Sequence, residues 1–386
     1  MRIILYTGKG GVGKTSIAAA TACKVAGEGK RVLVVSTDQA HSLGDSFDRK
    51  LSYDPIEIHD NLYAMEIDSF VENEKVWGNL KGYIEKLMMF KAENNIENEE
   101  LLVFPGFEEL LSLIKIKEIY DDGKYDVLIV DCAPTGETMS LLKFPELFKW
   151  WMDKFFPIKK RGAKLAKPIV EATLKIPMPN DKTFDDFERL YEKIQELHQL
   201  MLDKDVVSIR IVTTPEKIVV KEAKRSFSFL HLFDYNVDSI IINKIFPTAS
   251  LNGYFEKWAY IQEETITDIY DSFKGIPIFK LELLKDELRN YQKLEDVGKA
   301  IYGDTSPDNV LFQDKIFTVE KEANGYNLKI EMPFVDKNEL QLSQRGDEIL
   351  ISIKNERRCF ILPPKLHSKE ILGAKYDNGK LTINFQ

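Results

Sequence analysis

The chain has 386 residues and a mass of 44.5 kDa, enough for two domains, and 44% of its residues are hydrophobic, as ordinary cores require. Its formal net charge of −9 and pI near 5.4 argue against a nucleic-acid partner, because phosphate backbones are bound by concentrated Lys and Arg. The sequence enters a strand at once, without a leader, and has no apolar run approaching about 18 residues. We therefore expect a cytoplasmic protein with no integral membrane segment.

A glycine-rich loop with the spacing G-x-x-x-x-G-K-T follows the first predicted strand, at 2–6, and precedes a helix. Glycines let successive backbone N–H groups curl around a polyphosphate, and the helix N-terminus adds positive partial charge. In this pattern Lys14 reaches the β and γ phosphates, and the hydroxyl of Thr15 ligates Mg²⁺. We therefore predict ATP and Mg²⁺ as cofactors. The nucleotide-binding residues expected in the loop are Gly8, Lys9, Gly10, Gly11, Val12, Gly13, Lys14, Thr15 and Ser16.

Five further runs rich in β-branched and apolar residues are typical of buried parallel strands. They span 32–37, 125–131, 206–213, 237–243 and 276–280. Because helical stretches separate these runs, we predict an α/β fold: a doubly wound parallel-sheet P-loop NTPase with helical insertions. The nucleotide should lie beyond the carboxyl ends of the strands.

Two acidic residues occupy such carboxyl ends. Asp38 follows the strand at 32–37 and could orient or deprotonate a water aimed at the γ phosphate, although an Asp that caps the next helix is the alternative. Asp131 ends the strand beside the loop, where a carboxylate can hold Mg²⁺ directly or through water. We expect Thr15, Asp38 and Asp131 around the metal, and Asp38, Lys9 and Lys14 to act in catalysis.

Lys9 directly after the first glycine is not needed in an ordinary phosphate loop. The run K-G-G-V-G-K-T resembles the deviant form found in dimeric ATPases of the MinD, ParA, nitrogenase iron protein and ArsA group. The resemblance implies a homodimer in which Lys9 crosses the interface and touches the partner's nucleotide.

Later segments resemble one branch of that group, the ArsA/GET family, which includes ATPases that target tail-anchored membrane proteins. The run from Asp38 to Leu43 resembles its D-P-A-H switch I, with Gln39 in place of proline. Residues 131–138 resemble its switch II, which implies that Gly136 reports hydrolysis to the following helix. The segment 213–216 resembles its T-x-P-E motif. Asn243 resembles the asparagine that reads the adenine edge, and Pro277 to Lys280 would form the other wall of the base pocket.

Two long insertions, at about 60–120 and 139–204, are predicted to be mainly helical. The second contains an almost entirely apolar helix at 144–157, which must be buried, dimer-facing or held against another apolar body. Core or lid packing would explain it. The resemblance implies instead a groove for a hydrophobic client, such as a membrane-anchor helix, delivered to a transient membrane receptor.

The helical pattern stops near 303–309, so we expect an ATPase domain at 1–305 and a β-sandwich at 313–386. Period-two alternation marks strands at 315–319, 326–332, 349–354 and 380–385, with turns at 324–325, 345–346 and 378–379. The runs 349–358 and 373–383 resemble the α-crystallin (small heat-shock protein) domain that closes some ArsA-like ATPases. Such a domain could hold unfolded clients, form an oligomer contact or dock on the ATPase.

Two other functions stay open. An ArsA-like ATPase could drive arsenite efflux, but arsenite binding by thiolates needs clustered cysteines, and Cys23, Cys132 and Cys359 lie far apart in the sequence. The protein could also be a scaffold that uses nucleotide as a structural switch, with negligible turnover.

Overall fold

The computed structural model describes residues 1–38, 42–67, 107–133, 135–136, 138–140, 142–146, 181–251, 253–322, 325–354 and 356–386. It divides into two compact units. The first contains residues 1–66, 125–135 and 202–386, and the second contains residues 67–124 and 136–201.

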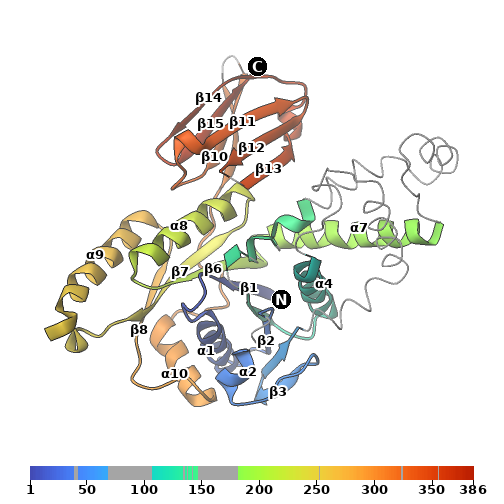
Figure 1. The fold of residues 1–386 in the computed structure, drawn as a ribbon. Helices are drawn as coiled ribbons and strands as arrows, with labels where there is room; N and C mark the ends of the chain where they lie inside the picture. Colours follow the sequence, from blue (N-terminus) through green and yellow to red (C-terminus); the bar gives the residue numbers. More distant parts are fainter. Residues whose placement is uncertain are drawn as a thin grey trace, which may run out of the picture. The chain divides into compact units, whose positions relative to one another are not determined.

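The first unit is built on an eight-stranded sheet with the order β3-β4-β2-β5-β1-β6-β7-β8 (Figure 1). Neighbouring strands are parallel except for the edge strand β3, which runs antiparallel to β4. The central strands are buried along their whole length except for the half-buried Arg2, which explains their continuous apolar sequence. The strands are β1 (Arg2–Thr7), β2 (Val32–Ser36), β3 (Ile56–His59), β4 (Leu62–Glu66), β5 (Val127–Asp131), β6 (Val207–Thr213), β7 (Val237–Ile245) and β8 (Ile278–Glu282).

Helices cover both faces of this sheet, as a doubly wound fold requires. Helices α1 (Lys14–Gly27) and α10 (Tyr291–Tyr302) pack together on one face, and α8 (Lys217–Leu232) lies on the other (Figure 1). Gly298 of α10 lets α10 pack closely against α1, because a Cβ at this position would come within 2.4 Å of the Ala20 carbonyl oxygen. The remaining helices are α2 (Ser42–Phe47), α9 (Glu256–Ser272) and the 3₁₀ turns Thr248–Ser250 and Gly253–Phe255.

The predicted sheet is confirmed, with two additions. Strands β3 and β4 were not predicted, because β3 is short and alternates between exposed and half-buried residues. The first helical insertion therefore cannot begin at about 60, since residues 62–66 are a sheet strand.

The second unit contains α4 (Phe107–Asp122) and α7 (Asp181–Leu202). Lys117 pairs with Glu196 at 3.6 Å, which joins the two helices, and Leu190, Ile194 and Leu197 form a buried stripe on α7. Most of the predicted apolar helix at 144–157 lies outside the described residues, as does most of the first insertion.

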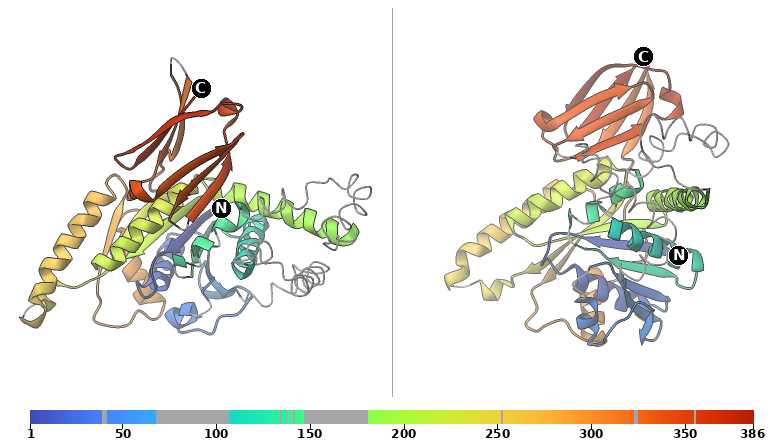
Figure 2. Two further views of the ribbon diagram at one scale, coloured as in Figure 1. Left: turned by 45° about the horizontal axis from the view of Figure 1, so that its top comes forward. Right: turned by 45° about the vertical axis from the view of Figure 1, so that its right-hand side comes forward.

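The C-terminal part forms two facing antiparallel sheets, β14-β15-β10-β9 and β11-β12-β13 (Figure 2). Alternate residues of β10, β12 and β15 are buried between them, among them Ile330, Ile351 and Ile383. The strands are β9 (Phe317–Glu322), β10 (Gly325–Glu331), β11 (Leu340–Arg345), β12 (Glu348–Ile353), β13 (Glu356–Ile361), β14 (Ile371–Asp377) and β15 (Lys380–Phe385), with 3₁₀ turns at Lys337–Glu339 and Pro364–Leu366. The predicted sandwich is confirmed, although β11, β13 and β14 were not predicted as strands.

The sandwich contacts the end of α8 directly (Figure 1). The imidazole of His231 contacts the Glu331 carbonyl oxygen through Nδ1 at 3.2 Å, and Arg358 donates to the Leu232 carbonyl. Phe334 packs edge-on against Phe227, with ring centroids 6.0 Å apart. These contacts bury polar and aromatic groups from both parts, so the sandwich docks on the part of the unit built around the parallel sheet.

The segment between α10 and the sandwich is held by a buried ion pair. Arg210 and Asp238 are both fully buried, with Nε and Oδ1 3.0 Å apart. Arg210 also donates to the Pro307 carbonyl at 2.6 Å, and Asp238 accepts from the Leu311 N–H at 3.4 Å. Since a buried charge is tolerated only with such partners, this segment is an ordered connection.

Candidate nucleotide site

The glycine-rich loop lies at the carboxyl end of β1, between the ends of neighbouring strands. A Cβ on Gly8 would lie 2.2 Å from the Val212 carbonyl oxygen, and one on Gly13 would lie 2.5 Å from Nδ2 of Asn243. Gly13 also has a φ of +90°. A larger residue at Gly8 would have to displace backbone, and one at Gly13 would have to displace the Asn243 side chain and adopt a strained φ, so these two glycines set the shape of the loop.

Helix α1 starts directly from this loop and presents an uncapped N-terminus. No side chain caps its first turn, and no acidic residue lies there. The unpaired N–H groups and the helix dipole therefore favour an anion at this point. Lys14 is buried in the first turn at 6% exposure, while Thr15 and Ser16 are half-buried.

Asp131 lies at the centre of the site. Strand pairing places it between Tyr6 of β1 and Ser36 of β2, and its side chain is fully buried. Burial raises the pKa of its carboxyl to about 7, although the nearby hydroxyl of Thr15 and the Lys14 ammonium act in the opposite direction. Neither carboxylate oxygen has a hydrogen bond of ordinary geometry within the described residues.

A buried carboxylate of this kind needs a cation or a water to balance it. Carboxylate and hydroxyl oxygens are the ligands that Mg²⁺ prefers, and the hydroxyl of Thr15 faces the same carboxylate. The residues present therefore fit a magnesium ion.

Asp38 follows β2 beside this carboxylate and raises its pKa by charge repulsion. The Asp38 N–H donates to the Ser36 hydroxyl at 3.2 Å. A few residues on, the hydroxyl of Ser42 in α2 lies 3.2 Å from the hydroxyl of Thr15. The sequence analysis missed Ser42, because only the folded chain brings α2 back to the loop.

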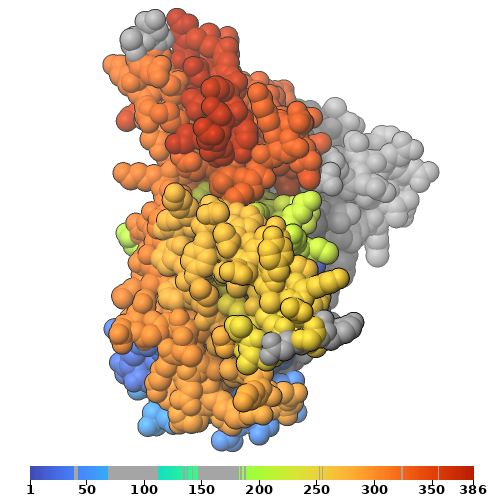
Figure 3. Space-filling model, turned by 90° about the vertical axis from the view of Figure 1, so that its left-hand side faces the viewer, coloured from blue at the N-terminus to red at the C-terminus, as the bar shows by residue number. Residues whose placement is uncertain are grey.

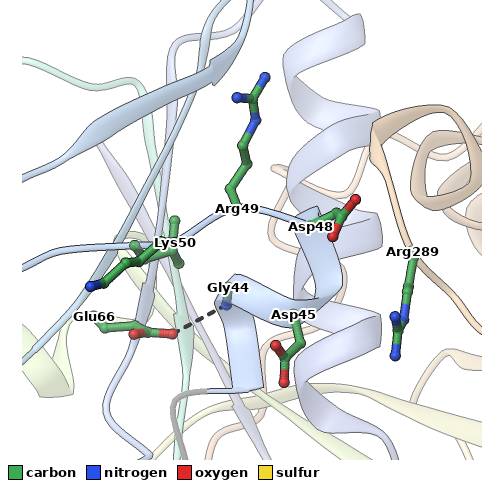
Figure 4. A pocket seen from close by; sticks show the side chains of 8 residues that line it. Gly44, Asp45, Asp48, Arg49, Lys50, Glu66 and Arg289 are labelled. Atoms are coloured by element: carbon green, nitrogen blue, oxygen red, sulfur yellow. Dashed lines mark hydrogen bonds between the residues drawn. The ribbon is translucent and has the colours of Figure 1, made fainter.

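Helix α2 is held from its other side by Glu66, whose carboxylate accepts the Gly44 N–H at 3.1 Å (Figure 4). A surface hollow of about 600 Å³ opens there, and Figure 4 shows acidic and basic side chains around it, including Asp45 and Arg289. None of the phosphate-loop residues lines this hollow. It is therefore separate from the nucleotide site.

The two loop lysines have different surroundings. The Lys14 ammonium acts on Asp131, inside the site. Lys9 is 39% exposed, and its ammonium lies 3.9 Å from the Glu222 carboxylate on α8. Of the two ammonium groups, that of Lys14 is therefore the one directed at Asp131.

The end of β7 supports the loop from behind. Asn243 donates from Nδ2 to the Val12 carbonyl at 2.8 Å and accepts the Lys244 N–H at 2.8 Å. The Lys244 ammonium donates to the Gly11 carbonyl at 2.6 Å. Sequence reasoning singled out Asn243 but gave Lys244 no role.

Two family models match the chain. Residues 1–303 match a family model described as anion-transporting ATPase, and residues 323–385 match one described as an HSP20-like domain found in ArsA. The chain belongs to the anion-transporting ATPase family. It is therefore an ATPase, and the family resemblance drawn from its motifs is confirmed.

Relatives of this ATPase cover the whole chain or its first domain. A protein of Aquifex aeolicus (strain VF5) with the provisional name arsenical pump-driving ATPase 1 is 38% identical over 393 residues, covering 99% of both chains. ATPase ASNA1 homolog 2 of Paramecium tetraurelia is 28% identical over 301 residues, covering 76% of this chain and 91% of its own. ATPase get3 of Pyrenophora tritici-repentis (strain Pt-1C-BFP) is 28% identical over 323 residues, covering 78% and 91%.

The structure also describes two further predicted site residues of this ATPase, Pro277 and Gly136. Pro277 lies at the amino end of β8, where its carbonyl accepts the Ile240 N–H at 3.0 Å, three residues before Asn243 along β7. Gly136 belongs to the second unit, where it is exposed and its carbonyl accepts from the Ser140 hydroxyl at 3.1 Å. Gln39 and His41 of the predicted switch I lie outside the described residues, as does Glu137 of switch II.

In the part of this ATPase that the structure describes, no helix combines the length and the apolar sequence that a membrane span requires. Nor do three His, Cys, Asp or Glu side chains gather there as a metal cluster. The three cysteines are free thiols, with Cys23 and Cys132 buried and Cys359 exposed.

Proposed function

We propose that this ATPase is a homodimer that binds Mg-ATP between its subunits and couples hydrolysis to the binding and release of a hydrophobic client. Lys14 and the loop N–H groups bind the triphosphate, Thr15 and Asp131 hold Mg²⁺, and Asp38 orients the attacking water. The name of the Pyrenophora relative connects this architecture to the get3 group.

The different settings of the two lysines carry this proposal. Lys14 is a buried residue, whereas the Lys9 side chain is 39% exposed and its ammonium lies 3.9 Å from the Glu222 carboxylate, a weak ion pair. An exposed ion pair at that distance contributes little, so Lys9 is easily released. It is then available to a second subunit, where a positive charge stabilises the phosphoryl group in transfer.

The exposed apolar surface supports a second subunit on this side. Phe246 follows β7, Leu283 and Leu284 follow β8, and Ile218 lies in the first turn of α8, so all four lie near the carboxyl edge of the sheet, where the loop also lies. Helix α9, which faces the viewer in Figure 3, adds exposed aromatic side chains such as Trp258 and Tyr260. Large exposed apolar areas are typical of interaction surfaces.

Mixed dimers test the role of Lys9 in trans. Lys9→Ala and Asp38→Asn should each abolish hydrolysis while ATP binding persists. A 1:1 mixture should regain about a quarter of the parental rate, because half of randomly paired dimers are mixed and each has one complete site. The dimeric mechanism would be refuted if the mixture regained no activity and if sedimentation showed that the parent protein stays monomeric in saturating Mg-ATP.

The client is tested separately, at the predicted apolar helix. Trp151→Ser combined with Phe155→Ser should reduce capture of an apolar peptide by the Mg-ATP-loaded protein, with Leu372→Ser at an exposed position of β14 as an apolar control. Unchanged capture would count against a client groove in this insertion.

Arsenite transport is the second candidate function, because the Aquifex relative covers 99% of the chain and carries the arsenical-pump name. It predicts that arsenite stimulates ATP hydrolysis. A rate unchanged by arsenite would remove this candidate.

A further inference from the structure

Lys244 occupies an unusual backbone position at the end of β7. Its φ is +56°, in the left-handed region that residues other than glycine rarely adopt. Its N–H donates to the side chain of Asn243 rather than to the neighbouring strand. Strain of this kind persists only where the surrounding structure enforces it, and it gathers at functional sites.

The position aims the lysine side chain across the phosphate loop. The Lys244 ammonium donates to the Gly11 carbonyl at 2.6 Å, and the neighbouring Asn243 donates to the Val12 carbonyl at 2.8 Å. Two successive loop carbonyls are thus bound from one side. Because the N–H and C=O groups of a peptide point in opposite directions, holding these carbonyls leaves the N–H groups that follow them free to face a phosphate.

We propose that Lys244 is a positioning residue of the nucleotide site, which fixes the phosphate loop in its binding shape through the Gly11 carbonyl. Gly11 is exposed and has no side chain to pack, so the loop has little else to hold it at this point. A charged donor forms a stronger bond than a neutral one, and it orders the loop before the nucleotide arrives. The proposal rests on the family's ATPase activity and is independent of the dimer and the client.

The test compares three full-length variants. Lys244→Met keeps the alkyl chain and loses the donor, and Lys244→Arg keeps a charged donor. Lys257→Met removes the same charge from an exposed site on α9 and serves as the control. Dissociation constants are measured with a non-hydrolysable ATP analogue and Mg²⁺, kcat with ATP, and hydrogen exchange of residues 9–15 without nucleotide.

We expect Lys244→Met to weaken analogue binding by about tenfold, the loss that one charge-assisted hydrogen bond at an exposed site predicts. The loop amides should exchange faster in the nucleotide-free protein, kcat should stay within about twofold, and Lys244→Arg should restore most of the affinity.

Two results would overturn the proposal. Binding by Lys244→Met equal to that of the Lys257→Met control would show that the lysine does not act on the site. Weaker binding with unchanged exchange would show that the ammonium touches the nucleotide instead of ordering the loop. A parent that binds the analogue but stays monomeric would refute the proposed dimer without bearing on Lys244.

Discussion

Acid should loosen the attachment of the sandwich through His231. This imidazole is 2% exposed at the end of α8, against Glu331 of β10. Burial lowers its pKa to about 4; the Glu331 carbonyl and Asp234 act in the opposite direction, while Lys204 adds to the lowering. An exposed imidazole titrates near 6.5, so between these two pH values the unfolded chain binds a proton that the folded chain does not.

The sign and size of the effect follow from that difference. The contribution of His231 to the free energy of unfolding is fully present above about pH 6.5 and is lost as the pH falls. The loss is about 2 kcal/mol at pH 5 and roughly 3 kcal/mol at pH 4. Urea denaturation at pH 7.5 and 5.0 measures it, with hydrogen exchange of β10 locating the loss.

His231→Asn keeps a donor for the Glu331 carbonyl but cannot titrate, so its loss between the two pH values should be smaller by about 2 kcal/mol. His59→Asn removes an exposed imidazole and serves as the control. An acid dependence in His231→Asn equal to that of the parent would refute the reasoning.

Three further substitutions test the site and the docked sandwich. Asp131→Asn should abolish Mg²⁺-dependent hydrolysis yet raise the melting temperature of the nucleotide-free protein at pH 8, because it removes a buried charge whose oxygens have no hydrogen bond of ordinary geometry among the described residues. Gly8→Ala should weaken ATP binding at least about tenfold, because its Cβ would lie 2.2 Å from the Val212 carbonyl oxygen. Arg358→Met should weaken docking by about 1–3 kcal/mol, seen as faster proteolysis between α10 and β9, because the Leu232 carbonyl loses its buried donor.

Matched variants decide these outcomes. Gly10→Ala should cost less than Gly8→Ala, since no atom lies within 4 Å of its Cβ position. Arg357→Met, at an exposed neighbour of Arg358, should leave proteolysis unchanged. Equal loss of ATP binding in Gly8→Ala and Gly10→Ala would contradict the steric argument, and equal proteolysis of Arg358→Met and Arg357→Met would contradict the docking argument. A lower melting temperature for Asp131→Asn would contradict the charge argument.

The sequence predicted the parts of the fold that have a strong local pattern. The continuous apolar runs became the buried parallel strands, because both faces of such a strand are covered. Strands β11, β13 and β14 were not predicted, because many of their side chains are exposed and polar. An edge strand of this kind depends on its neighbour more than on its own residues.

The candidate site divides in the same way. Gly13 and Lys14 follow from a fixed spacing within one segment, so the sequence reveals them. In the folded sheet β7 lies only one strand away from β1, with β6 between them. This strand order brings Lys244 into contact with Gly11, a residue more than two hundred positions earlier in the sequence. No periodicity in 237–245 carries that information.

Gly13 is the position where the local motif and the long-range contact meet. Its spacing before Lys14 and Thr15 is explained by the turn into α1, where its φ of +90° excludes most residues. The 2.5 Å between its Cβ position and Nδ2 of Asn243 adds a second reason. That amide must come this close to bind the Val12 carbonyl, so the glycine is required by the loop and equally by the strand that supports it. Enlarging Gly13 would therefore disturb the support of the loop even if the turn itself could adapt.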